Sequence, residues 1–303
     1  MLHRYTHNNL TWIDLESPTH EEVLELMGEF DIEALVAEEL LLPTHKPRVE
    51  LHENFVYMIL HFPALRHTHQ NIEQEIDFII GRNFIVTTRY DTIDPIHKFS
   101  KVFEVNSVLD KSNIGEHAGF IFYYMLKKMY KSVEHEIGYI HDALEGIETN
   151  IFSGKEKDMV SSLSNTGRDL LNLRQSIEPH RDILKEYEAF GSTFFGIEFS
   201  PYLKALTNDY YRVHSHIVRQ IESLKELRET NNSLLYAKQN EAMKVVAILA
   251  FVTFPLSLIA SIFGMNTVYL PLAGNQNDFW IIMTIMAVLT FSFFLFFKYK
   301  KWL

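Results

Sequence analysis

Two long uncharged segments dominate the hydropathy pattern near the C-terminal end of the chain. Residues 245–263 and 279–297 each run for about nineteen residues without Asp, Glu, Lys or Arg. At roughly 1.5 Å per helical residue, each would extend about 28 Å, which matches the hydrocarbon core of a bilayer. One such run is compatible with a buried helix of a soluble protein. Two in tandem, joined by a short polar connection, predict a transmembrane hairpin.

Positive charges lie on one side of this predicted hairpin. Lys238 and Lys244 precede the first segment, a lysine-rich tail at 298–301 follows the second, and residues 264–278 contain no Lys or Arg. Because Lys and Arg concentrate in cytoplasmic flanks, both termini are predicted to be cytoplasmic and the connection external. About four-fifths of the chain would then precede the membrane on the cytoplasmic side.

Short patterns typical of strands and amphipathic helices occupy the first hundred residues. Thr19 and Glu22 have the spacing of a capping box, which marks the start of a helix ending near Phe30, and residues 32–41 suggest a second helix. Gly81-Arg-Asn83 has the composition of a hairpin turn. Strands are predicted at 12–15, 48–51, 55–62, 76–80 and 84–88. Together they predict an α/β domain, assigned to residues 1–110.

Longer helical patterns fill residues 111–199. Residues 120–152 contain few helix breakers, and residues 157–190 form a second long segment. Residues 190–196 combine two glycines with three phenylalanines, which predicts a turn with exposed aromatic side chains.

The next predicted element is a very long helix. Ser200-Pro201 is a typical helix start, and no Gly or Pro follows until Pro255. Residues 200–263 are therefore predicted to form a stalk that continues as the first span, with an external loop at 264–278 and a second span and basic tail at 279–303. Such a helix needs neighbours along its length, which a symmetric homo-oligomer supplies around a shared axis.

One face of the predicted first span carries polar residues. Positions that recur every three or four residues share a helix face. On this face lie Asn240, Met243, Val246, Ala250, Phe254, Ser257, Ser261 and Gly264. Serines in a span can also bond back to their own helix or allow close helix packing. Their position on the face that leads to Asn266 favours a pore lining.

Several motifs resemble the CorA family of divalent-cation channels. Gly264-Met265-Asn266 ends the first apolar segment, as in that family, and a basic tail follows the second. The resemblance also rests on Asn240-Glu-Ala-Met-Lys-Val, Pro255, Tyr269-Leu-Pro271, Lys300-Lys-Trp-Leu303, Lys46-Pro-Arg-Val-Glu50 and Tyr57-Met-Ile-Leu60. It covers nearly the whole chain and implies a homopentamer that transports Mg²⁺, with Co²⁺ or Ni²⁺ as alternative ions.

The resemblance makes Gly264-Met265-Asn266 the candidate selectivity filter. Mg²⁺ prefers oxygen ligands and loses its water reluctantly, so a ring of Asn266 amide oxygens could bind the hydrated ion without stripping it. A ring of carboxylates would release the ion more slowly. Gly264 would permit close approach of helices or would simply end the helix. Met265 is predicted to serve packing rather than binding.

Candidate gates lie below this filter. Rings of Met243, Val246 and Phe254 could block ions by dewetting, although the family commonly has Met where this chain has Phe254. A basic collar at the cytoplasmic mouth would consist of Lys298, Lys300 and Lys301, which are equally explained as a membrane anchor. The predicted loop carries one acid, Asp278, and has Leu272 where many family members have Glu. Attraction of cations to the mouth would therefore be weak.

The family's feedback by Mg²⁺ implies carboxylates between neighbouring subunits. Asp209 is the match by position, although that alignment needs a gap and a solvated helix acid is the alternative; Asp91 and Asp94 are weaker candidates for its partner. Other metal patterns are rejected, because Tyr139 stands where a metalloprotease motif at Glu134-His135-Glu136 needs His. The pairs His67/His69 and His214/His216 are interpreted as surface residues.

Composition narrows the function class. A net charge of -11 argues against nucleic acid as a partner, and the lack of cysteine excludes disulfides and thiolate metal sites. The N-terminus lacks the apolar stretch of a signal peptide. No phosphate-binding loop or nucleophile–base pair indicates an enzyme or an organic cofactor.

The prediction is passive Mg²⁺ transport into the cytoplasm through the inner membrane of a prokaryote, by identical subunits in a lipid bilayer. Two alternatives remain at this point. One is a zinc transporter of the same superfamily, and the other is a membrane-anchored sensor or scaffold that conducts no ions.

Overall fold

The computed structural model describes residues 1–7, 9–44, 46–63, 73–90, 93–109, 115–266, 277–300 and 302. The chain forms two compact units, Met1–Arg228 and Glu229–Leu303. The division falls within one long helix.

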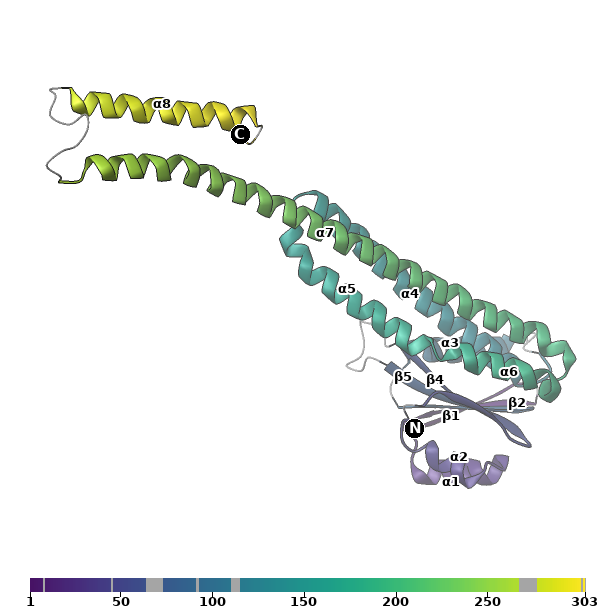
Figure 1. The fold of residues 1–303 in the computed structure, drawn as a ribbon. Coiled ribbons are helices and arrows are strands. Elements are labelled where there is room, and N and C mark those ends of the chain that lie inside the picture. Colours follow the sequence, from purple (N-terminus) through teal and green to yellow (C-terminus); the bar gives the residue numbers. More distant parts are fainter. Residues whose placement is uncertain are drawn as a thin grey trace. The chain divides into compact units, whose positions relative to one another are not determined.

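A mixed six-stranded sheet organises the first unit (Figure 1). Its strand order is β1-β2-β6-β5-β4-β3, with β2 and β6 parallel and every other pair antiparallel. The strands are β1 (Leu2–His7), β2 (Leu10–Glu16), β3 (Arg48–Leu51), β4 (Phe55–Pro63), β5 (Glu73–Gly81) and β6 (Phe84–Arg89). All five predicted strands are confirmed, and β1 is an additional edge strand whose polar sequence gave no clear signal.

Two short helices, α1 (His20–Phe30) and α2 (Ala34–Glu39), cover one face of the sheet. The predicted capping box is present, since the Thr19 hydroxyl accepts the Glu22 N–H and the Glu22 carboxylate accepts the Thr19 N–H. Buried side chains of both helices pack on Ile13, Tyr57 and Ile79 of the sheet. The second helix is shorter than the 32–41 predicted.

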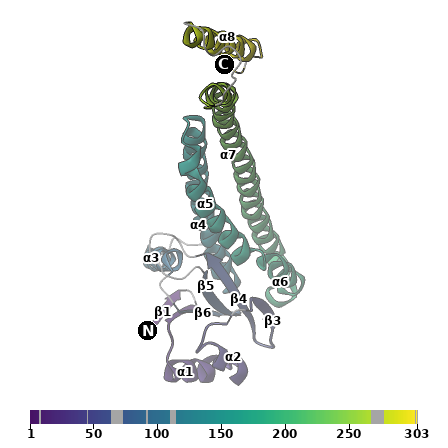
Figure 2. The same ribbon diagram turned by 60° about the vertical axis from the view of Figure 1, so that its left-hand side comes forward.

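Helices α3 (Asp94–Leu109), α4 (Gly119–Phe152), α5 (Glu156–Ile177) and α6 (His180–Phe195) lie on the opposite side of the sheet from α1 and α2 (Figure 2). Aromatic contacts fasten α3 and α4 to the sheet. Trp12 meets Phe99 of α3 edge to face, and Phe78 meets Phe122 of α4 in the same way. Helix α3 was not predicted, whereas α4 begins one residue before the predicted start.

Two sequence predictions in this layer were wrong. The segment 157–190 is two helices, because Pro179 has no N–H to continue the hydrogen-bond ladder between α5 and α6. The predicted turn at 190–196 is the last part of α6, which ends at Gly196 with φ of 102°. Gly191 serves packing, since a Cβ there would lie 3.0 Å from a methyl carbon of Leu203. Phe194 and Phe195 are half-buried rather than exposed.

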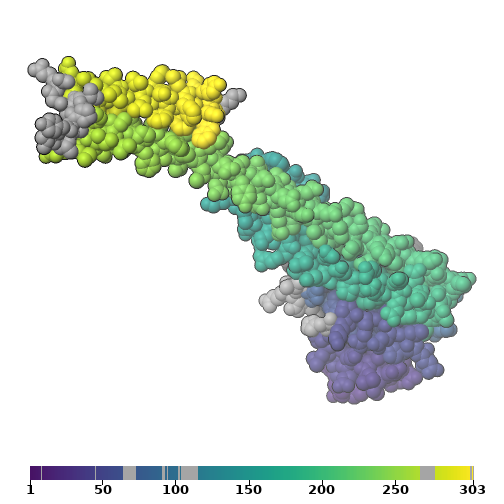
Figure 3. Space-filling model, in the orientation of Figure 1, coloured from purple at the N-terminus to yellow at the C-terminus, as the bar shows by residue number. Residues whose placement is uncertain are grey.

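Helix α7 (Ser200–Phe263) is one continuous helix of 64 residues, preceded by a 3-10 turn at Ile197–Phe199. In the second unit, α8 (Asp278–Tyr299) runs beside the C-terminal part of α7 (Figure 3). A half-buried stripe on α8 ends at Phe297, which is 4% exposed and lies 6.5 Å from the ring of Phe251. Both helices are long and apolar enough to cross a membrane.

Exposed glycines within α4 give a first stability prediction. Gly138 and Gly146 have open space where a Cβ would project. Replacing either with Ala is expected to raise the free energy of unfolding by about 0.5–1 kcal/mol, because glycine loses more backbone entropy in a helix. Urea denaturation followed by circular dichroism measures this gain. Gly191→Ala is the matched control and should lose stability through its contact with Leu203. Loss of stability at Gly138 and Gly146 would contradict the prediction.

Candidate functional site

The Gly-Met-Asn segment directly follows the last turn of α7. The Gly264 N–H donates to the Ala260 carbonyl at 2.8 Å, and the Met265 N–H donates to the Ile262 carbonyl at 3.3 Å. A Cβ at Gly264 would lie 3.1 Å from the Ala260 carbonyl oxygen, so glycine eases this helix end. The Asn266 side chain is exposed just beyond it. The geometry agrees with a helix-ending role for Gly264 and leaves the Asn266 amide available for binding.

The predicted pore face of α7 is uncovered in a single chain. Its side chains are exposed, apart from half-buried Ala250 and the glycine, and Phe254 reaches 74% exposure. Other half-buried positions of this segment, which include Ile248, Val252 and Ile259, lie on a different face. Large exposed apolar side chains on a helix of this kind require lipid or protein neighbours. The face is therefore free to contact further copies of α7.

Two features loosen α7 at the candidate gate. Pro255 lies inside the helix and has no N–H to donate to the Phe251 carbonyl. Two residues earlier, the Thr253 hydroxyl donates to the Leu249 carbonyl at 2.8 Å. A side-chain hydrogen bond to the carbonyl four residues back favours bending of the helix. Phe254 stands between them. Sequence reasoning recognised Pro255 but missed the contribution of Thr253.

The basic tail begins in the last turn of α8. Lys298 and Lys300 are exposed, whereas Lys301 lies outside the described residues. The Trp302 ring stacks on Phe297 with a centroid distance of 6.0 Å, and the backbone N–H of Trp302 donates to the Phe297 carbonyl at 2.9 Å. Aromatic side chains favour membrane interfaces, so Trp302 fixes the tail at the end of the span. This anchor was part of a recognised motif but received no role from the sequence.

Most of the predicted external loop, 267–276 with Leu272, lies outside the described residues. Asp278 is the first residue of α8, and its carboxylate accepts the Phe279 N–H at 2.7 Å. An acid at a helix N-terminus is favoured by the helix dipole. Asp278 thus has a structural role at the start of the second span.

The candidate sensing residue Asp209 is largely buried on α7 at 8% exposure. The Arg212 guanidinium lies 2.9 Å from its carboxylate and also donates to Glu134 of α4 at 2.7 Å. Any Mg²⁺ at Asp209 would therefore compete with this arginine. Asp94 opens α3, and Asp91 is outside the described residues, as are His67 and His69.

No group of three His, Asp or Glu side chains capable of holding a metal occurs in the part of the chain that the structure describes. A complete regulatory site would therefore need groups from outside the described residues or from another chain. The sequence predicts that regulatory ions bind between subunits. The described part of one protomer contains no complete set of ligands, so this stays a prediction.

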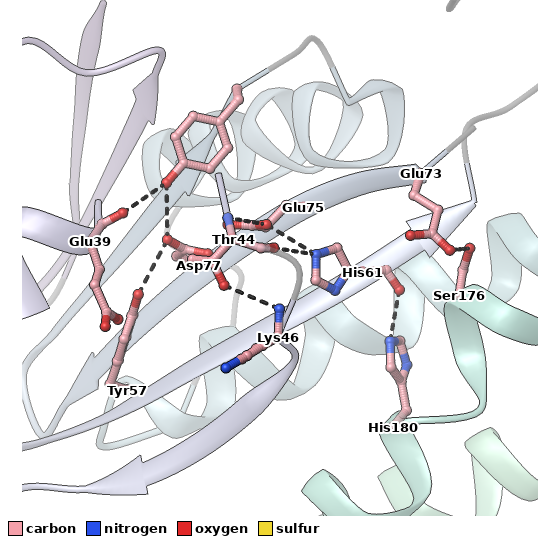
Figure 4. Close-up of polar contacts among 11 residues, drawn as sticks. Glu39, Thr44, Lys46, Tyr57, His61, Glu73, Glu75, Asp77, Ser176 and His180 are labelled. Carbon is pink, nitrogen blue, oxygen red and sulfur yellow. Dashed lines mark hydrogen bonds and ion pairs between the residues drawn. The ribbon is translucent and has the colours of Figure 1, made fainter. Parts of the chain in front are cut away.

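The structure also reveals a polar network at the end of β4 and β5 that the sequence did not suggest (Figure 4). His61 lies opposite Glu75 in the antiparallel register, with Nε2 3.0 Å from the Glu75 carboxylate and 2.9 Å from the Thr44 carbonyl. Burial acts to lower the pKa of His61, but these two hydrogen bonds outweigh it and raise the pKa. On the opposite face, His180 Nε2 donates to the His61 carbonyl at 2.8 Å. Burial lowers the pKa of His180 to about 3, so this ring is neutral.

The sequence resembles known transport proteins over most of its length. The family model described as "CorA-like Mg2+ transporter protein" matches residues 7–300. The Cobalt/magnesium transport protein CorA of Thermotoga maritima is 26% identical over 306 residues, covering 97% of this chain and 83% of that protein.

Two solved structures show the same fold. The complete structure of the CorA magnesium transporter from Methanocaldococcus jannaschii superposes with a TM-score of 0.83 at 23% identity, covering 99% of this chain and 93% of that one. The cytoplasmic domain of ZntB from Vibrio parahaemolyticus gives 0.62 at 10% identity, covering 77% and 90%. At these identities, the likenesses concern the fold alone.

Proposed function

The chain belongs to the family of CorA-like Mg²⁺ transporter proteins, and from this membership we propose that it moves Mg²⁺ into the cytoplasm through a pore lined by α7 of several identical subunits. The observation that carries this proposal is the uncovered face of α7 that leads to Asn266. A single hairpin cannot enclose a water-filled path, so conduction requires an oligomer. The family resemblance supports a homopentamer, in the inner membrane of a prokaryote with both termini cytoplasmic.

Ion binding at the outer end would rely on Asn266. Its exposed amide follows the last turn of α7, so symmetric copies would present a ring of neutral oxygen acceptors. Such a ring hydrogen-bonds the water shell of Mg²⁺ and avoids the slow release expected of carboxylates. A membrane potential supplies about 4.6 kcal/mol per 100 mV for a divalent ion, so entry needs no further energy source.

The gate would lie at Phe254, with Val246 and Met243 as further collars toward the cytoplasm. Apolar rings exclude ions by dewetting when the pore is narrow. Because Thr253 and Pro255 weaken the helix on both sides of Phe254, a bend at this point would change the radius of the ring. Lys298, Lys300 and Lys301 would surround the cytoplasmic mouth.

Ion uptake into proteoliposomes tests this function. The purified chain is reconstituted with an inside-negative potential, and Mg²⁺ entry is followed with a fluorescent indicator in the presence of Co²⁺, Ni²⁺ or Zn²⁺. We expect Mg²⁺ entry that Co²⁺ and Ni²⁺ compete for. Entry of Zn²⁺ without Mg²⁺ would instead support a zinc transporter, and entry of neither ion would support an anchored scaffold.

Feedback through Asp209 gives a second prediction. Asp209→Asn should raise the internal Mg²⁺ concentration that half-inhibits uptake by about tenfold, equivalent to about 1.4 kcal/mol of lost ion binding. Arg212→Gln should lower that concentration, because it removes the competing cation 2.9 Å from Asp209. Uptake measured at varied internal Mg²⁺ gives both values, with Asp142→Asn on the exposed side of α4 as the control. Unchanged inhibition in Asp209→Asn would exclude Asp209 as a sensor.

A further inference from the structure

Among the residues that the structure describes, one carboxyl group is buried between the sheet and α2 without a positive counter-charge. Asp77 lies on β5, two residues from Ile79, and therefore points to the face that α1 and α2 cover. Its side chain is inaccessible to solvent. The Asp77 Oδ2 atom accepts hydrogen bonds from the hydroxyls of Tyr57 at 3.4 Å and Tyr90 at 3.2 Å. The Oδ1 atom has no hydrogen-bond partner among the described residues.

The cations near Asp77 are engaged elsewhere. Arg48 pairs with Glu39 and, at 2.7 Å, with Glu50. His61 pairs with Glu75, and Lys46 is exposed. The charged and titratable groups around Asp77 come from α2, the α2–β3 connection, β3, β4, β5 and the residue after β6: Glu39, Lys46, Arg48, Glu50, Tyr57, His61, Glu75 and Tyr90. His45 of the same connection lies outside the described residues.

This environment disfavours the ionised form of Asp77. Burial raises the pKa of Asp77, the negative charge of Glu75 raises it further, and the two tyrosine hydroxyls only partly oppose these effects. Burial also raises the pKa of Tyr57 and Tyr90, so both hydroxyls remain donors. Glu75 and Asp77 share one face of β5. Two carboxyl groups are both acceptors when ionised, and they can bond to each other only through a shared proton.

We propose that Asp77, beside Glu75 on β5, is a proton-binding site that holds a proton at neutral pH and so keeps a second negative charge away from Glu75. This proton keeps the connection between α2 and β3 attached to the sheet. The ligand of the site is the proton itself, and neither Asp77 nor Glu75 belongs to α7.

The attachment depends on Glu75. The Thr44 N–H donates to both Glu75 oxygens, at 2.8 and 2.7 Å, and His61 joins the Thr44 carbonyl to Glu75. Figure 4 shows these groups together at the end of the two strands. If Asp77 lost its proton, two adjacent buried anions would repel each other, and Glu75 would be driven from Thr44. Alkaline pH is therefore expected to release the connection.

The sign of the pH effect follows from proton linkage. An unfolded Asp releases its proton near pH 4, whereas the folded chain retains the proton at Asp77 to a higher pH. The folded state therefore loses stability as pH rises between those two values. The unfolding equilibrium constant increases about tenfold for each pH unit in this range. His61 adds a separate loss of stability above about pH 6.5, because the pKa of its ring is raised in the folded chain. Asp77→Asn removes the first loss and leaves the second.

The test compares full-length wild type with Asp77→Asn and Asp14→Asn. Asp14 is the matched control, since it is equally buried but paired with Arg89 at 3.1 Å. At pH 7 the wild type should show the infrared C=O stretch of a protonated carboxyl group, which Asp77→Asn removes and Asp14→Asn retains. Asp77→Asn should also melt at a higher temperature than the wild type at pH 8, with the difference vanishing near pH 4. Asp14→Asn should melt at a lower temperature.

Three outcomes would overturn the proposal. The first is a wild type without the protonated-carboxyl signal at pH 7, and the second is a signal that Asp77→Asn leaves intact. The third is stabilisation of the wild type at pH 8 by added Mg²⁺ or Na⁺ in the absence of the signal, which would show that a cation neutralises Asp77. If Asp77→Asn fails to fold, titration of the wild-type signal decides, because it should disappear only above neutral pH. None of these measurements depends on ion transport.

Discussion

Replacing Asn266 with alanine is expected to reduce Mg²⁺ uptake by at least about 100-fold while leaving assembly intact. The exposed amide just beyond the last turn of α7 would lose its carbonyl oxygen in every subunit of the ring at once. Hydrogen bonds to charged groups contribute about 1.5 kcal/mol or more each, so the loss of two is enough for this reduction. Initial uptake rates in proteoliposomes, with size-exclusion chromatography of the same samples, measure both properties.

A matched control separates the filter from a general effect of losing an amide. Asn232 is an exposed asparagine on the same helix, outside the predicted span, and Asn232→Ala should retain wild-type uptake. Asn266→Asp should bind Mg²⁺ more tightly and conduct it more slowly, because a carboxylate ring holds the ion. Wild-type uptake in Asn266→Ala would show that the Asn266 side chain does not contact the permeating ion.

The long elements of the fold were predictable because their signals are local. Helix α7 could be predicted from the absence of Gly and Pro between Pro201 and Pro255. The capping box of α1 could be predicted from four consecutive residues. Glycine was the weakest guide. Gly191 indicated a turn, but its role is close contact with Leu203. The two residues are brought together only when α6 and α7 pack, so the sequence alone does not show this contact.

The parts that sequence reasoning missed depend on register and burial. His61 and Glu75 are fourteen residues apart, and only the antiparallel pairing of β4 with β5 places them side by side. Likewise, Asp77 is one acid among many in the sequence, and only the fold shows that it is buried with no counter-charge among the described residues. For the proposed ion pathway, the periodicity of α7 predicted a face, and the side chains of that face are exposed in a single chain. In the proposed oligomer, closing this face around an ion would require several chains.

Asp14→Ala is expected to lower the free energy of unfolding by about 3–5 kcal/mol, the largest stability effect we predict. Asp14 and Arg89 are each 3% exposed on the parallel pair β2 and β6, with the Arg89 Nε 3.2 Å and Nη2 3.1 Å from one carboxylate oxygen. The other oxygen accepts the Thr87 hydroxyl at 2.8 Å, and that hydroxyl in turn accepts the Trp12 indole N–H. The substitution therefore removes a counter-charge and the end of a hydrogen-bond chain together. Urea denaturation of wild type and variant measures the loss.

The exposed pair between Arg4 and Glu29 provides the control, since Glu29→Ala should cost less than about 1 kcal/mol. A cost for Asp14→Ala no larger than that of Glu29→Ala would show that Glu16, 3.0 Å from Arg89, is a sufficient counter-charge by itself. Asp14 and Asp77 are both buried carboxyl groups of one sheet, yet neutralising them is predicted to have opposite effects at neutral pH. Both are buried, but within the described part of the chain only Asp14 has a buried cation beside it, and this difference determines the sign of the stability change.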